Sequence, residues 1–172
     1  MSQRSAKRHP VIHELKNEKQ IDNKMKEQDY AISITVDGTP QEAFKSINSV
    51  TKWWTENLEG SSQNLNDEFT VRFGDVHVST QKLIEFIPNK KVVWLVTDSN
   101  LNFIKDRQEW TNTKISFEIF EKDSKTQIRF THLGLAPKEC FDACSNAWSE
   151  YVHQSLLSLI NTGKGQPTQK ER

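Results

Sequence analysis

The stretch that decides the fold is Lys125-Thr-Gln-Ile-Arg-Phe-Thr-His-Leu-Gly-Leu-Ala-Pro137, together with the segment that follows it. Ile128, Phe130 and His132 alternate with polar residues, which predicts a β-strand with one inward face. The Leu-Gly-Leu-Ala-Pro sequence breaks that alternation. A helical spacing of apolar residues then runs over about 142–161, a length of roughly 30 Å at ~1.5 Å per residue. We therefore expect one strand followed by one long helix that crosses a small domain.

The predicted helix has one apolar face. Steps of about 100° place the following residues together on it: Cys144, Trp148, Tyr151, Val152, Ser155 and Leu159. Pro137 could open the helix, but Asp142 is a better N-cap, so we expect a short first turn before the main helix. Gly163 supplies the glycine expected just past a helix end.

The chain before this stretch opens with a strand and two short helices. Tyr30–Val36 alternates and is rich in β-branched residues, as strands are. Thr39-Pro40-Gln41-Glu42 has the pattern of a capping box at the start of a helix. Ser49 can cap a second short helix that carries Trp53 and Trp54.

The middle of the chain predicts a meander of strands. Residues 55–67 are polar and form an expected surface loop, and the strands that follow are joined by short turns, which favour antiparallel neighbours. We predict an α+β fold of order β-α-α-β-β-β-β-β-α, with about six strands in one curved antiparallel sheet. The later strands are expected at 69–73, 76–87, 91–98, 113–122 and 125–133.

Composition limits the class of protein. Lys plus Arg and Asp plus Glu are equal at 23 each, so no net charge favours nucleic acid as a partner. No apolar run approaches the ~18 residues of a membrane span. Cys140 and Cys144 lack zinc-site spacing, and we interpret them as reduced thiols of a cytoplasmic protein. We expect residues 1–28 to be a polar, disordered leader, 29–167 one domain, and 168–172 a tail.

Several of these motifs together resemble a known superfamily. They are the strand 126–132 with its Leu-Gly-Leu continuation, the helix with Trp148, the capped helix after Thr39 and the Trp53-Trp54 pair. The chain is similar to the START-like, or SRPBCC, helix-grip superfamily, and most of all to the branch of activators of the heat-shock-protein-90 ATPase. The likeness covers about 30–167 and implies a curved sheet wrapped around the C-terminal helix. It does not select a function, because one fold supports many.

A helix held by a curved sheet can enclose an apolar pocket, so we expect a small hydrophobic or amphipathic ligand between the two. The 99–112 segment is the expected mouth or lid. The candidate ligand-binding residues are Trp94, Phe103, Trp110, Phe117, Phe130, His132, Trp148, Tyr151 and Ser155. No catalytic residue, metal ligand or cofactor is assigned.

Simpler structural roles compete with this interpretation. The aromatic residues can be packed core. His132 is favoured as a structural histidine bonded to a backbone carbonyl, and Ser155 as a helical serine bonded to the carbonyl one turn back.

Two other functional classes stay open. A cyclase-like enzyme would need an acid or base such as His132, Glu109 or Asp106, although no catalytic motif appears and we favour a non-enzyme. A chaperone partner is implied only by the resemblance, and the protein can be a monomer or a homodimer. A cavity above roughly 300 Å³ would favour ligand binding, whereas an exposed apolar patch beyond several hundred Å² would favour a protein partner.

Overall fold

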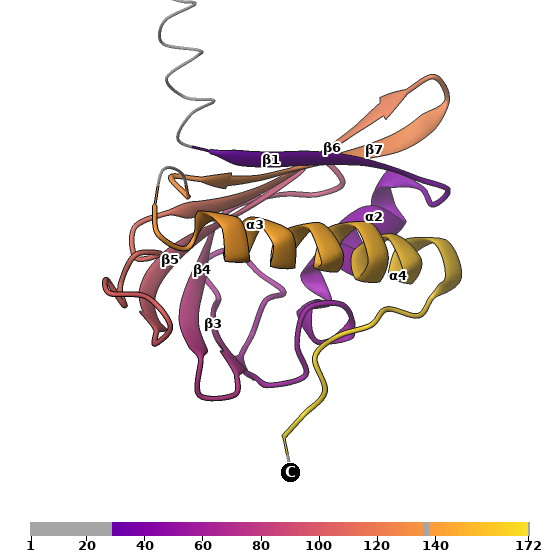
Figure 1. Ribbon diagram of the computed structural model, residues 1–172. Helices are drawn as coiled ribbons and strands as arrows, with labels where there is room; N and C mark the ends of the chain where they lie inside the picture. The colour runs from indigo at the N-terminus through magenta and orange to yellow at the C-terminus, as the bar shows by residue number, and fades with distance from the viewer. Residues whose placement is uncertain (1–28, 136–137, 172) are drawn as a thin grey trace, which may run out of the picture.

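The computed structural model describes residues 29–135 and 138–171. The expected leader, 1–28, and Pro137 lie outside the described residues. One antiparallel sheet of seven strands, in the order β1-β7-β6-β5-β4-β3-β2, curves around the C-terminal helix (Figure 1). The strands are β1 (Tyr30–Val36), β2 (Leu58–Gly60), β3 (Glu68–Phe73), β4 (His77–Ile87), β5 (Lys91–Leu101), β6 (Lys114–Lys122) and β7 (Lys125–Leu133). The predicted α+β helix-grip architecture is confirmed.

The sheet buries the faces that the alternation predicted. Phe117 lies opposite Phe130 in the β6–β7 register, and both are fully buried. Trp94 on β5 also points into the core, as expected. The N-terminal strand β1 pairs with β7 and places Tyr30 opposite His132.

Helix α2 (Pro40–Asn48) begins as its sequence predicts. The Thr39 hydroxyl accepts a hydrogen bond from the Glu42 amide, and the Glu42 carboxylate accepts one from the Thr39 amide. This reciprocal cap fixes the helix start. Ala43 and Ile47 then face the core, where α2 packs against β6, β7 and the C-terminal helix.

The C-terminal helix is continuous but not uniform. It consists of α3 (Phe141–Glu150), a π-helical segment η2 (Tyr151–Leu156) and α4 (Leu157–Thr162), and it ends at Gly163 with a left-handed φ of 82°. Figure 1 shows it running along the concave side of the sheet. The expected N-cap, Asp142, is wrong, because Cys140 occupies the cap position. Wider turns of the π-helical kind often occur at functional sites.

Two local predictions differ from the structure. The segment 55–67 is not only loop, since Leu58–Gly60 pairs with β3 as a short edge strand. The second short helix is a single 3₁₀ turn, η1 (Val50–Lys52), and Ser49 makes no side-chain cap there. The β-propensity of a polar segment does not show that a neighbouring strand, here β3, will pair with it and make it an edge strand.

Candidate functional site

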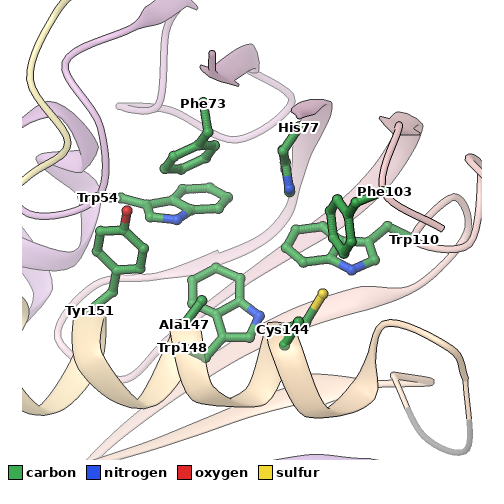
Figure 2. Close-up of a pocket in the computed structure, with 10 residues that line it drawn as sticks. Trp54, Phe73, His77, Phe103, Trp110, Cys144, Ala147, Trp148 and Tyr151 are labelled. Atoms are coloured by element: carbon green, nitrogen blue, oxygen red, sulfur yellow. The ribbon is translucent and has the colours of Figure 1, made fainter. Parts of the chain in front are cut away.

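A hollow of about 190 Å³ lies between the curved sheet and α3 and opens to solvent. Figure 2 shows its walls, with the helix on one side and aromatic residues of the sheet and loops on the other. We call it the tryptophan pocket. Its lining residues are Trp54, Phe73, His77, Phe103, Trp110, Ala143, Cys144, Ala147, Trp148 and Tyr151. Its volume falls short of the roughly 300 Å³ expected from the sequence for a ligand pocket.

All five tryptophans of the chain belong to one aromatic array. Trp148 is its centre, with its ring 4.8 Å from that of Trp54 and 5.8 Å from that of Trp110. Trp53 and Trp94 continue the array into the core behind Trp54. Because the inner rings support the outer ones, the pocket wall is held in place by packing.

The helix contributes small side chains to the mouth of the pocket. Ala143 and Ala147 are exposed there, one helical turn apart. Phe103, in the loop after β5, also lines the pocket and is 47% exposed. The exposed part of the lining therefore includes two methyl groups and one aromatic ring, of which Figure 2 labels Ala147 and Phe103.

One polar side chain, His77 at the start of β4, lies among the aromatic rings and is only 8% exposed. Its Nε2 is 2.8 Å from the hydroxyl of Ser79, which also accepts a hydrogen bond from the Gln81 side-chain amide. These three residues alternate on the inner face of β4. Burial lowers the pKa of His77 to about 3, so the ring is neutral at physiological pH.

His132 belongs to the core behind the pocket. Its Nδ1 accepts a hydrogen bond from the indole N–H of Trp148 at 3.0 Å, and its Nε2 lies 2.9 Å from the Thr113 hydroxyl. Nε2 must therefore carry the proton and donate it to Thr113. Burial lowers the pKa of His132 to about 3, with a smaller contribution from the charge of Lys138. The expected structural histidine is thus bonded to two side chains and not to a backbone carbonyl.

The nine candidate residues do not all reach the pocket. Phe103, Trp110, Trp148 and Tyr151 line it. The others are packed or bonded elsewhere: Trp94, Phe117, Phe130, His132 and Ser155.

Ser155 does not line the tryptophan pocket, and its hydrogen bonds differ from the one expected. Its hydroxyl donates to the carbonyl of Trp53 and accepts from the amide of Gln166, so the predicted bond to the preceding helical turn is wrong. It lines a second, more polar hollow of about 210 Å³ with Tyr151 and Thr168. Bonding across 102 residues cannot be read from the local helical pattern.

The sequence did not identify Trp54, Phe73 and His77 as pocket residues. Trp54 follows η1 and stands near Phe73 and Trp148, with ring centroids 5.5 and 4.8 Å away. His77 was not recognised because the buried residues of β4 include the polar His77, Ser79 and Gln81, so the alternation of this strand does not mark its inward face. A polar row on an inward face is the signal that could have found it.

The loop that carries Trp110 is tied to the start of α3 through Glu109. One carboxylate oxygen accepts from the Glu139 amide at 2.6 Å and the other from the Cys140 amide at 2.9 Å. A carboxylate at a helix N-terminus satisfies free amides and complements the helix dipole. Both Glu109 oxygens are occupied, so this residue is a cap in the present geometry.

The two cysteines are paired in the structure. The sulfur atoms of Cys140 and Cys144 are in bonding contact, and their Cα atoms are 5.5 Å apart. The interpretation as two separate reduced thiols therefore differs from the structure, because residues four apart meet on one face at the helix start. In 29–135 and 138–171, no group of three or more His, Cys, Asp or Glu side chains is arranged to hold a metal ion.

Comparison with known proteins agrees with the geometry. The dimeric Aha1 of Colwellia psychrerythraea matches with a TM-score of 0.65 at 23% identity, over 80% of this chain and 98% of that one. MLL2253 of Mesorhizobium loti matches with a TM-score of 0.61 at 12% identity, over 77% and 95%. EF2215 of Enterococcus faecalis, a conserved protein of unknown function, matches with a TM-score of 0.57 at 15% identity, over 83% and 77%. These similarities establish a shared helix-grip fold.

The sequence itself identifies the family. Residues 41–161 match the family model described as activator of Hsp90 ATPase homolog 1-like protein. The chain belongs to this family, a branch of the START-like superfamily. No curated protein is significantly similar to it. Within the described residues, no helix is both long and apolar enough to cross a membrane.

Proposed function

We propose that this domain reversibly binds a small hydrophobic or amphipathic ligand in the tryptophan pocket. The observation that supports this most is an open hollow of about 190 Å³ between sheet and helix whose ten lining residues include no charged side chain. Apolar concavities with few polar groups are the usual sites for small molecules.

The size of the pocket restricts the ligand. An engineered apolar cavity of about 150 Å³ binds benzene, whereas drug-sized ligands use roughly 300 Å³ or more. A pocket of about 190 Å³ therefore fits a compound with one or two rings. Larger ligands would have to displace Phe103 or extend out of the mouth.

The test is a titration with indene, followed by tryptophan fluorescence. Trp54, Trp110 and Trp148 line the pocket, so binding changes the emission directly. Ala147→Phe fills the mouth and should weaken indene binding at least tenfold, whereas Asn146→Phe, on the neighbouring exposed position outside the lining, should leave it unchanged. Equal binding by all three proteins would refute the site. Native mass spectrometry of protein from its own host then identifies the natural ligand.

The family match favours a second candidate, a module that stimulates a chaperone ATPase. Val76 and Phe103 are 50% and 47% exposed beside the pocket mouth, and the Asn102 amide bonds to the Val76 carbonyl. Such exposed apolar residues can contact a protein partner. Stimulation of the host Hsp90 ATPase that is lost in a Val76→Ser, Phe103→Ser variant would support this role. An unchanged ATPase rate would remove it.

A cyclase-like reaction has less support. Of the candidate acids and bases, His132 uses both ring nitrogens and Glu109 both carboxylate oxygens. Asp106 is exposed and accepts a hydrogen bond from the Gln108 amide. If His132→Ala leaves turnover of every candidate substrate unchanged, that histidine is not a base.

A further inference from the structure

The hydrogen bonds along β4 favour one tautomer of His77. Ser79 is almost fully buried, and its oxygen accepts the amide hydrogen of Gln81. The hydroxyl hydrogen needs an acceptor, and within the described residues the partner in reach is Nε2 of His77. With the Gln81 amide in this orientation, Nε2 accepts, and the neutral ring carries its hydrogen on Nδ1.

The Nδ1–H group has no hydrogen-bond partner within the described residues. This group is not among the described side-chain atoms that are both without a partner and fully shielded from solvent. Those atoms are Asn48 Oδ1, Gln81 Oε1 and the Nε1 atoms of Trp94 and Trp110. The His77 ring lines the pocket, and Figure 2 shows it projecting between Phe73 and Trp110. Among the described residues, the pocket is thus provided with a directional donor from the sheet, besides the indole N–H of Trp54, which also has no hydrogen-bond partner there.

The rest of the lining is uncharged. The remaining nine residues are aromatic, alanine or cysteine, and the Tyr151 hydroxyl is already bonded to that of Thr168. An ionised ligand buried here would lose its hydration without gaining an opposite charge, which is costly. A flat apolar ligand instead matches the aromatic walls.

We infer that the ligand of the tryptophan pocket is a flat, uncharged ring compound with a hydrogen-bond acceptor, such as a ketone oxygen, that receives the Nδ1–H of His77. This inference rests on the proposed function and specifies its ligand class. The chain from Gln81 through Ser79 acts by positioning, because it holds the proton of His77 on the nitrogen that faces the ligand.

Three probes of nearly equal size separate the possibilities. Indene has no hydrogen-bonding group, 1-indanone has an acceptor and indole has a donor. The dissociation constant of each is measured by calorimetry with the wild-type protein, His77→Phe, Ser79→Ala and Ser99→Ala. Ser99 is the matched control, because it lies directly opposite Ser79 in the β4–β5 register, is equally buried, and bonds to Thr111.

We expect the preference for 1-indanone over indene to fall about fivefold in His77→Phe, the effect of one neutral hydrogen bond. Ser79→Ala should lower the same ratio by a smaller factor, since the proton of His77 is then free to occupy either nitrogen. Ser99→Ala should leave it unchanged. If His77→Phe does not fold, Ser79→Ala against Ser99→Ala decides.

The outcomes distinguish this inference from the proposed function. If indene binds, but the preference for 1-indanone over indene in His77→Phe and in Ser79→Ala equals that of the wild-type protein, the proposed pocket stands and the inferred ligand class is wrong. If indole gains His77-dependent affinity instead, Nδ1 is an acceptor and the inference is overturned. If no probe binds, the proposed function fails and this inference fails with it.

Discussion

The indole N–H of Trp148 donates to Nδ1 of His132 across 3.0 Å, which joins the C-terminal helix to strand β7 inside the core. The second nitrogen of His132 continues to the Thr113 hydroxyl, which donates to the Trp110 carbonyl. The indole of Trp148 and the backbone of Trp110, two residues that line the pocket, are therefore connected through one buried histidine.

Removing this bond should destabilise the domain more than its size suggests. Trp148→Phe leaves Nδ1 of His132 buried without a donor, which costs about 1–3 kcal/mol in addition to the lost packing. A double-mutant cycle with His132→Phe in chemical denaturation isolates the pair, and we expect a coupling above about 1 kcal/mol. Additive effects would show that the two side chains do not interact.

Stability should fall as the pH is lowered from neutral. Burial holds the pKa values of His77 and His132 at about 3, below the ordinary 6.5, so between these limits the unfolded chain binds more protons than the folded one. Each histidine should therefore contribute a loss of roughly 1.4 kcal/mol per pH unit below about 6.5. Denaturant unfolding of the wild type and His77→Phe from pH 7 to 5 measures the difference in slope. Parallel slopes would contradict the buried, neutral state of His77.

Glu109 should matter to helix α3 without being catalytic. Glu109→Gln removes the charge and one of the two acceptors for the Glu139 and Cys140 amides, and we expect a loss of about 1–2 kcal/mol. Hydrogen exchange of those two amides should accelerate. Asp106→Asn, an exposed carboxylate in the same loop, is the control and should change neither quantity.

The segment 163–168, which follows the C-terminal helix, should hold the pocket wall in place. Thr168 donates its amide to the Trp54 carbonyl, and its carbonyl accepts from the Glu56 amide, so this segment runs beside the residues after η1. A Cβ at Gly165 would collide with the Lys52 carbonyl, and Gly165→Ala should therefore displace this segment and weaken indene binding. Gly163→Asn is the control, because nothing lies near its Cβ position and asparagine tolerates a positive φ. If Gly165→Ala and Gly163→Asn both bind indene as tightly as the wild-type protein, the segment 163–168 does not hold the pocket wall.

Local patterns in the sequence predicted much of the fold. Alternation located the inward faces of β6 and β7, the Thr39–Glu42 pair located α2, and Gly163 located the helix end, because each depends on neighbouring residues. The site was harder to predict. The partners of Ser155 and Glu109 lie 102 and about 31 residues away, so only the folded chain reveals them. Trp54 and His77 join the pocket from separate elements for the same reason.

The aromatic candidates include both pocket-lining residues and fully packed core residues. Trp94, Phe117 and Phe130 have the same inward orientation as the pocket residues, yet other aromatic rings cover them: Trp53 packs against Trp94 and Phe117, and Trp148 against Phe130. Period-2 alternation specifies the face of a strand and not the distance from helix to sheet along it. The hydropathy pattern of a strand therefore cannot distinguish residues that line the pocket from residues that pack in the core.

The most direct test of the account is a ¹H–¹⁵N spectrum of the five indole N–H groups during titration with indene. We predict that the signals of Trp54, Trp110 and Trp148 shift together with one dissociation constant, while that of Trp53, whose N–H is bonded to the Ile47 carbonyl in the core, moves least. Shifts confined to residues of the second hollow, such as Gln154 and Gln166, or no saturable shifts at all, would contradict a ligand site in the tryptophan pocket.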